Sequence, residues 1–303
     1  MTQIVALTGA SGFIGQHITN ALLERGIGVR ALTRGRCNAR QGVEWVRGSL
    51  DSEQSLATLV RGASAVIHCA GQVRGGSPDV FQRVNVDGTL RMVAAAKAAG
   101  SCERFLLISS LAARHPDLSW YARSKFEAER LAIDAAGTLP VSVFRPTAVY
   151  GPGDRELHPV FAWLLRGWLP RLGQADARLS FLHVQDLARA CADWLAAARV
   201  RTTVYELSDG AMGGYDWDKL TAIGAAVRGA PVRQVNVPAS LLRHLATLNL
   251  IWHRLVGGEP MLTPSKVNEL LHPDWSSSDR AISADLGWRP GIELERALRG
   301  RLF

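Results

Sequence analysis

Residues 8–15 read TGASGFIG and stand between a short apolar run, Gln3–Leu7, and a helical pattern. The spacing Gly9-x-x-Gly12-x-x-Gly15 lets a backbone turn tightly, approach a pyrophosphate and pack a helix on a strand, while the helix amides face the anion. A glycine-rich turn without a ligand can have the same letters, but the strand–turn–helix context favours a dinucleotide site. The residues expected to contact the dinucleotide are Gly9, Ser11, Gly12, Phe13, Ile14 and Gly15.

Outward from this turn, short apolar runs alternate with helical patterns, which is typical of a parallel sheet covered by helices. The expected strands are Ile4–Leu7, Gly28–Leu32, Val43–Val46, Ala65–His68, Arg104–Ile108 and Val141–Arg145. The expected helices include Ile14–Glu24, Val86–Ala99 and Ser119–Ala136. The pattern therefore predicts an α/β chain built on a doubly wound parallel sheet, the Rossmann fold.

The regular alternation fades after Arg145, where Pro146, Pro152 and Pro159 interrupt the chain. A further strand at Val204–Leu207 is expected to return to the sheet. We expect residues 1–150, completed by this strand, to form the nucleotide-binding domain. Residues 151–303 are expected to form a smaller, mostly helical substrate lobe that is interleaved with it.

Composition excludes several classes of function. The chain has 303 residues, a net charge of +8 and four cysteines without a Cys-x-x-Cys pair, and neither cysteines nor histidines have the spacing of a metal site. No basic run with interleaved aromatic residues points to nucleic acid. The strand-like start leaves no signal peptide, and no apolar stretch reaches about eighteen residues, so a cytoplasmic protein with reduced thiols is expected.

The end of the second expected strand indicates which dinucleotide is bound. Folds specific for NAD usually place an acid there to hold the ribose hydroxyls, whereas an arginine suits the 2′-phosphate of NADP. This chain has Arg34 at that position, with Arg36 close behind and no Asp or Glu nearby. We therefore expect NADP, with NAD as the alternative and a solvated surface arginine as the competing interpretation of Arg34.

A candidate proton-transfer group follows the fifth strand. Tyr121 and Lys125 are one helical turn apart, so the phenol and the ammonium share a face. A fixed ammonium, together with a bound nicotinamide, is expected to lower the pKa of the phenol, which can then exchange a proton with a carbonyl oxygen as hydride moves. Ser109 and Ser110 end the preceding strand and can hold the same oxygen.

The same spacing occurs a second time, at Tyr215 and Lys219. Spacing alone therefore decides nothing. The first pair follows a strand and a serine pair inside the alternating region, and the second follows Gly213 and Gly214 beyond it. This context favours Tyr121 as the reacting phenol.

Taken together, these features resemble the extended short-chain dehydrogenase/reductase family, which includes nucleotide-sugar epimerases and dehydratases, hydroxysteroid dehydrogenases and dihydroflavonol reductases. The resemblance runs from Thr8 to about Pro290. Besides the glycine turn and the Tyr121 pair, it rests on His68–Gly71, Asn85–Thr89, Arg145–Pro152, His183–Leu187 and Leu286–Pro290.

The resemblance implies a role for several residues. Ser110 matches the catalytic Ser/Thr, Tyr121 the acid/base, and Lys125 the residue that holds the nicotinamide ribose. Ala70 and Gly71 would line the cofactor through their backbones, and Pro146 would flank the nicotinamide. Leu50 falls where the family has an apolar residue near adenine, although Ser49 replaces the usual aspartate beside it.

The substrate is indicated by two departures from the sugar-nucleotide members. Those members carry a longer insert before the tyrosine and an Arg-Asp pair where this chain has Leu179-Ser180. Both departures favour hydride transfer between NADP and a ketone or secondary alcohol. The alternatives are a nucleotide-sugar epimerase, dehydratase or 4-keto reductase, and a non-catalytic NADP-binding regulator or assembly factor.

The lobe is expected to supply a mainly apolar pocket over the sheet edge. The residues expected to line it include Phe161, Trp163, Leu164, Trp168 and Leu179, although they suit the lobe's own core equally well. Leu241–Val256 has apolar residues at helical spacing, and a helix packed over the pocket is a simpler interpretation than a membrane contact. The expected partner is a small-molecule substrate, with a homodimer left open.

Overall fold

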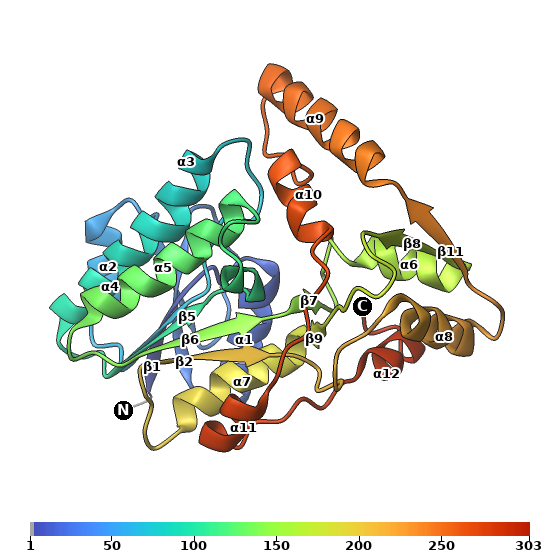
Figure 1. The fold of residues 1–303 in the computed structure, drawn as a ribbon. Coiled ribbons are helices and arrows are strands. Elements are labelled where there is room, and N and C mark those ends of the chain that lie inside the picture. Colours follow the sequence, from blue (N-terminus) through green and yellow to red (C-terminus); the bar gives the residue numbers. More distant parts are fainter. Residues whose placement is uncertain (1–2) are drawn as a thin grey trace.

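A seven-stranded parallel sheet forms the centre of the protein in the computed structural model, which describes residues 3–303 (Figure 1). Its strand order is β10-β6-β5-β4-β1-β2-β3. Successive strands are added on one side of β1 up to β3 and on its other side from β4 onward, which is the strand order of the predicted Rossmann fold, so that prediction is confirmed. The strands are β1 (Ile4–Thr8), β2 (Gly28–Thr33), β3 (Val43–Arg47), β4 (Ala65–His68), β5 (Arg104–Ile108), β6 (Val141–Pro146) and β10 (Thr203–Leu207).

Helices cover both faces of this sheet. One face carries α1 (Phe13–Glu24) and α7 (Val184–Ala196), and the other carries α2 (Glu53–Val60), α4 (Gly88–Ala99) and α5 (Trp120–Ala136) (Figure 1). Because successive residues of a strand point to opposite faces, each strand contributes to both cores. The central strands β1 and β4 are therefore continuous apolar runs, as the sequence predicted, whereas the edge strands β3 and β10 also carry Glu44 and Glu206.

One expected helix is longer and less regular than predicted. The chain is helical from α3 (Pro78–Phe81) through a π-helical stretch, Gln82–Asp87, into α4. The π-helical stretch widens the backbone at residues for which the sequence indicated only an ordinary helix start. Such turns are common at functional sites, and this one places Asn85 at the sheet edge described below.

The smaller lobe lies beside the carboxyl ends of the strands. It contains the parallel pairs β7 (Ala148–Tyr150) with β9 (Phe181–His183) and β8 (Trp168–Leu172) with β11 (Arg233–Val237). Its helices are α6 (His158–Arg166), α8 (Trp217–Arg228), α9 (Ala239–Val256), α10 (Pro264–Leu270) and α12 (Leu294–Arg299), while α11 (Arg280–Leu286) packs against β10.

The residues expected to line the substrate pocket lie elsewhere in this lobe. Phe161 and Leu164 are buried in the lobe's own core, and Leu179 packs against that core. Trp163 and Trp168 are half exposed on the outer surface. That part of the prediction is wrong because an apolar pattern shows that a residue is buried, without showing whether it faces a pocket or a core.

No helix within residues 3–303 has both the length and the apolar character needed to cross a membrane.

Candidate active site

The glycine-rich turn between β1 and α1 leaves no room for side chains. A Cβ atom on Gly15 would stand 2.0 Å from the carbonyl oxygen of Gly9, and one on Gly9, whose φ is +75°, would stand 2.7 Å from the amide nitrogen of Ala70. Gly12 is the N-cap of α1 and has no side chain that could accept the first helix amides. The turn therefore offers free amides to an anion at close range, which fits the pyrophosphate of a dinucleotide.

The other expected cofactor residues lie around this turn. Ser11 is exposed, and Phe13 and Ile14 are half-buried at the start of α1. Leu50 follows β3 and packs against Gly88 of α4, where a Cβ atom would stand 2.8 Å from Leu50 Cδ1. Pro146 is the last residue of β6 and is buried beside Leu207 of β10.

Arg34 and Arg36 are exposed just beyond β2. Within residues 3–303, neither arginine is part of a salt bridge. Both guanidinium groups are therefore available to a phosphate at this end of the sheet.

A buried network holds the end of β4 against the turn. The Thr8 hydroxyl accepts a hydrogen bond from the Ala70 amide at 3.1 Å and lies 2.7 Å from His68 Nδ1. His68 Nε2 lies 3.1 Å from the Thr89 hydroxyl. Burial lowers the pKa of His68 to about 3, so its imidazole is neutral and bridges the two threonines. This network positions Ala70 and Gly71 over the turn.

Tyr121 and Lys125 both lie on α5. The helix begins after Ser119, whose hydroxyl accepts a hydrogen bond from the Ala122 amide at 2.9 Å. Lys125 is buried, and its Nζ donates to the carbonyl oxygen of Ile108, the last residue of β5, at 3.0 Å. This bond fixes the ammonium at the carboxyl edge of the sheet, one helical turn from Tyr121.

Lys125 also lies against the backbone expected to line the cofactor. A Cβ atom on Gly71 would stand 3.1 Å from Lys125 Nζ and 3.3 Å from Asn85 Oδ1. The ammonium has three N–H donors, and one of them donates a hydrogen bond to the Ile108 carbonyl. The remaining donors, the open edge at Gly71 and the glycine turn together fit a nicotinamide ribose at this position.

The protein alone does not lower the pKa of the Tyr121 phenol as the sequence predicted. Burial raises that pKa, although a hydrogen bond with the Ser110 side chain acts in the opposite direction. Burial also lowers the pKa of Lys125, because the charged ammonium loses hydration. The phenol therefore keeps its proton at neutral pH, and Tyr121 stands as a proton donor.

The two serines at the end of β5 have different partners. Ser109 is buried, and its hydroxyl donates to the Glu129 carboxylate, which also accepts from Arg145 Nε at 3.0 Å. Ser110 is the residue whose side chain meets Tyr121, and its hydroxyl also accepts from the Ala112 amide at 3.2 Å. Only Ser110 therefore has a hydroxyl facing the phenol.

Two further residues support this arrangement: Glu129, which the sequence did not single out, and Asn85, which it gave only as the start of the Asn85–Thr89 motif. Glu129 anchors Ser109 and Arg145 through the contacts above, and its spacing of four residues from Lys125 on one helix was the available signal. Asn85 donates to the Ser124 hydroxyl at 2.9 Å and accepts from the Gln72 amide at 2.6 Å. Its position depends on the π-helical stretch, which no local pattern indicated.

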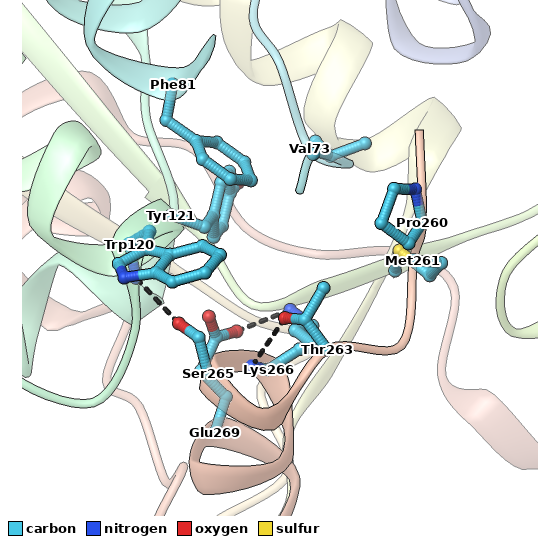
Figure 2. Close-up of a pocket in the computed structure, with 11 residues that line it drawn as sticks. Val73, Phe81, Trp120, Tyr121, Pro260, Met261, Thr263, Ser265, Lys266 and Glu269 are labelled. Atoms are coloured by element: carbon cyan, nitrogen blue, oxygen red, sulfur yellow. Dashed lines mark hydrogen bonds and ion pairs between the residues drawn. The ribbon is translucent and has the colours of Figure 1, made fainter. Parts of the chain in front are cut away.

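A pocket opens directly beside Tyr121 (Figure 2). It is lined by Val73, Gly75, Phe81, Trp120, Tyr121, Pro260, Met261, Thr263, Ser265, Lys266 and Glu269. The Trp120 amide donates to the Ser265 hydroxyl at 2.9 Å, which ties the start of α5 to α10. The lining thus comes from the segments at 73–81, 120–121 and 260–269 rather than from 161–179.

The polar side of this pocket is an ion pair on α10. Lys266 Nζ pairs with Glu269, whose other oxygen accepts from the Ser119 hydroxyl. Lys266 Nζ also stands 5.2 Å from the centre of the Tyr121 ring. Within residues 3–303, none of the four arginines of the lobe that could grip a diphosphate lines this pocket; they are Arg155, Arg166, Arg171 and Arg178.

The second Tyr-x-x-x-Lys pair lies in the core of the lobe. The Tyr215 hydroxyl donates to Asp209 Oδ2 at 2.5 Å, and Lys219 Nζ stands 4.4 Å from the centre of the Tyr215 ring. Tyr215 precedes α8, so the pair is not one helical turn of a single helix.

Across residues 3–303, no cluster of His, Cys, Asp and Glu side chains could hold a metal ion.

Comparisons with known proteins agree with this geometry. A model of the NAD dependent epimerase/dehydratase family matches residues 5–207. The ceramide reductase of Caulobacter vibrioides is 38% identical to this chain over 95% of it and 90% of that protein. The 2-alkyl-3-oxoalkanoate reductase of Stenotrophomonas maltophilia is 29% identical over 97% of each protein. A solved structure of MoeE5 in complex with UDP-glucuronic acid and NAD shares the fold, with a TM-score of 0.74 at 23% identity over 98% of this chain and 96% of that one.

The matched residues run through the glycine turn, the serine pair, Tyr121 and Lys125, and they end with the last strand of the central sheet. The relatives that cover nearly the whole chain carry the names of reductases and a dehydrogenase. The chain therefore belongs to the NAD dependent epimerase/dehydratase family and is an NAD(P)-dependent oxidoreductase of the extended short-chain dehydrogenase/reductase type.

Proposed function

We propose that this enzyme transfers hydride between NADP and a ketone or secondary alcohol that carries a long apolar chain, with Ser110, Tyr121 and Lys125 as its catalytic residues. The observation that carries the proposal is that Tyr121, which shares α5 with Lys125 and interacts with the Ser110 side chain, lines a pocket. The lining contains aromatic and aliphatic side chains and no arginine, and its one ion pair, Lys266 with Glu269, is internally neutralised. Such a pocket favours a substrate with little charge.

The proton moves through the chain's own residues. Tyr121 holds a proton at neutral pH and donates it to the substrate's carbonyl oxygen, which becomes the hydroxyl of the alcohol. The Ser110 hydroxyl donates a hydrogen bond to the same oxygen as negative charge develops on it. Lys125, fixed by the Ile108 carbonyl, orients the nicotinamide ribose and stabilises the phenolate that remains. A bound nicotinamide supplies the hydride in this direction and accepts it in the reverse one.

The relatives support the apolar chain. They are named as a ceramide reductase, a 2-alkyl-3-oxoalkanoate reductase and a ketoreductase whose substrate carries a farnesyl group. These names share a ketone or alcohol next to long hydrocarbon. The narrow pocket between Phe81, Trp120 and Pro260 suits the reacting end of such a molecule, with its hydrocarbon leading outward.

The nucleotide-sugar alternative and the non-catalytic alternative are less well supported. The diphosphate of a nucleotide sugar needs cations, and the one cation at the pocket, Lys266, is already paired with Glu269. Relatives named as reductases and dehydrogenases speak for catalysis. NADP is preferred in the proposal because the unpaired Arg34 lies at the end of β2. A homodimer and a cytoplasmic location stay predictions.

The test is an activity screen of the purified chain. NADPH and NADH oxidation are followed by absorbance with long-chain 3-oxo lipids in detergent micelles, and reaction with UDP-glucose and UDP-glucuronic acid is followed by chromatography. We expect turnover of the lipid ketones with NADPH and none of the nucleotide sugars. Turnover of nucleotide sugars alone would overturn the proposal.

A further inference from the structure

Helix α9 exposes a continuous apolar stripe. Every third or fourth residue along it is a large apolar side chain open to solvent, from 47% exposed at Leu245 to 78% at Leu255. The full stripe consists of Leu241, Leu245, Leu248, Ile251, Trp252, Leu255 and Val256. We call these seven residues the α9 stripe. The sequence predicted that Leu241–Val256 forms a helix packed over the pocket through its apolar residues. The helix is confirmed and Leu242 is buried, but the stripe residues from Leu245 to Leu255 face solvent, so for them the prediction is wrong.

A different face of α9 holds the helix in place. Leu242 and Ala246 pack with Val267 of α10, and the Asn249 amide donates to the Leu262 carbonyl at 2.8 Å. Figure 1 shows α9 at the outer edge of the molecule, with α10 between it and the rest of the chain. The helix is thus attached along one side, and the α9 stripe is left free. Contiguous exposed apolar surface of this kind marks an interaction site.

The charges on α9 and in the segment before it are positive, and the first acidic residue after the helix is the exposed Glu259. The chain contains no Asp or Glu from Lys219 to Gly258, while Arg228, Arg233, Arg243 and Arg254 lie in that segment. On α9 itself, Arg243, His244 and Arg254 are exposed, and His253 is half-buried. Apolar residues with a tryptophan on one face and arginines on the adjoining face are typical of a helix that lies in the plane of an anionic bilayer.

The buried face of α9, opposite the α9 stripe, borders the mouth of the pocket through Leu250. Leu250 of α9 and Pro260 of the pocket lining both pack against Gly76, where a Cβ atom would stand 3.5 Å from Leu250 Cδ1 and 3.9 Å from Pro260 Cγ. The Gly75 amide donates to the Pro260 carbonyl at 3.2 Å, and neighbouring Val73, also in the lining, is 48% exposed. A molecule leaving the bilayer beside α9 would meet this mouth next.

We propose that the α9 stripe docks on the surface of an anionic lipid bilayer, so that a lipid substrate enters the pocket from the membrane. The inference rests on the proposed function for the identity of the substrate. A second copy of the chain fits the stripe less well, because two α9 helices packed face to face would bring arginines together with no acidic side chain on either helix to pair with them. Docking of this kind needs no spanning helix.

The experiment is vesicle co-sedimentation of the full chain. The vesicles are phosphatidylcholine alone, and phosphatidylcholine mixed with phosphatidylglycerol. We expect the wild type to bind the mixed vesicles, to bind the neutral ones far less, and to dissociate as salt is raised. The double variant Leu248→Glu/Trp252→Glu should partition onto mixed vesicles at least about tenfold less, because two apolar side chains leave the interface and two negative charges face the lipid.

Matched variants separate docking from folding. Met212→Glu adds one negative charge, half the change made by the double variant, at an apolar side chain that is 96% exposed in the loop before Tyr215, and it should bind as the wild type does. Leu248→Ser/Trp252→Ser serves if the glutamates lower the thermal unfolding midpoint. Arg243→Gln/Arg254→Gln should lose the preference for phosphatidylglycerol and keep the remaining binding.

Three results would overturn the inference. They are failure of the wild type to bind mixed vesicles at low salt, equal binding by the α9 double variant, and a dimer in sedimentation velocity that the double variant converts to a monomer, which would make the stripe a contact between copies. The proposed function is separated by assaying a short, water-soluble ketone. Its turnover should be equal in wild type and double variant. Vesicle binding without turnover of any ketone would leave the docking in place and reject the proposed substrate.

Discussion

Two regions of the molecule carry the same Tyr-x-x-x-Lys spacing, and the structure gives them opposite surroundings. Tyr121 and Lys125 lie on one helix, beside the glycine turn and a pocket. Tyr215 lies before a helix, in the core of the lobe, with its hydroxyl bound to the buried carboxylate of Asp209. The first phenol faces space that a substrate can occupy, and the second has its hydrogen bond inside the protein.

The difference shows that Tyr-x-x-x-Lys spacing alone does not make a catalytic site. The surroundings of the phenol and the ammonium decide whether they can react with a substrate. Lys125 is buried, and its ammonium group donates to the Ile108 carbonyl. The positive charge is therefore held at a fixed position at the edge of the sheet. Lys219 stacks on the Tyr215 ring and donates to the Gly214 carbonyl at 3.2 Å, so it covers the phenol that it accompanies. Substitutions made in each region separately should therefore have different effects on turnover and on stability.

The largest expected effect is on turnover. Tyr121→Phe should lower kcat by about a thousandfold, because the proton donor is lost while the ring remains, and cofactor affinity should change little. The matched control is Tyr215→Phe, whose kcat should stay within about threefold of the wild type, because that phenol faces no substrate. Steady-state kinetics and cofactor fluorescence titration measure both. A lethal Tyr215→Phe with an active Tyr121→Phe would reverse the assignment.

The two variants should rank in the opposite order by their loss of stability. Tyr215→Phe should lower the free energy of unfolding by about 2–3 kcal/mol, because burial already raises the pKa of Asp209 and the variant removes the hydroxyl that stabilises its charge. Tyr121→Phe should cost less than about 1 kcal/mol, since that hydroxyl lies at a pocket. Urea unfolding of the two variants at neutral pH decides the matter. Equal losses would mean that both phenols are structural.

The free energy of unfolding should also depend on pH through His68, which lies in the nucleotide-binding domain. Its pKa is lowered to about 3 in the folded chain, against about 6.5 unfolded, so the unfolded state binds more protons between these values. The stability contributed by neutral His68 is therefore present above about pH 6.5 and is lost as pH falls, by about 2 kcal/mol at pH 5.

The control for this prediction is His68→Asn, which cannot titrate in that range. Its free energy of unfolding should fall less than that of the wild type between pH 7 and pH 5, by about the same 2 kcal/mol. Urea unfolding at both values of pH gives the difference. An identical acid sensitivity in both proteins would show that other groups, and not the buried imidazole, govern acid stability.

The smallest expected effect concerns the choice of dinucleotide. Arg34→Ala should weaken NADP binding by about tenfold, because one charge-assisted contact to the 2′-phosphate is lost at an exposed site, and should leave NAD binding unchanged. Arg178, an exposed arginine of the lobe near the second pair, provides the control, and Arg178→Ala should alter neither affinity. Equal affinity of the wild type for NAD and NADP in a fluorescence titration would remove the role assigned to Arg34.

The sequence by itself determined what depends on near neighbours in the chain. The strand–turn–helix around Gly9 and the apolar strands of the sheet follow from local spacing, and so does the shared face of Tyr121 and Lys125. Each of these patterns repeats with the period of one helix or one strand, so a few residues suffice to show it.

Only the tertiary structure decided what those elements meet. The pocket joins Phe81, Trp120 and Lys266, which lie far apart along the chain, and the π-helical stretch that positions Asn85 has no local signal. Phe161 and Leu164 entered the lobe's core, while Trp252 with the same apolar character stayed exposed. Hydrophobic burial is non-directional, so a pattern shows that a side chain will leave water wherever a partner surface exists, and the packing of distant segments chooses that surface.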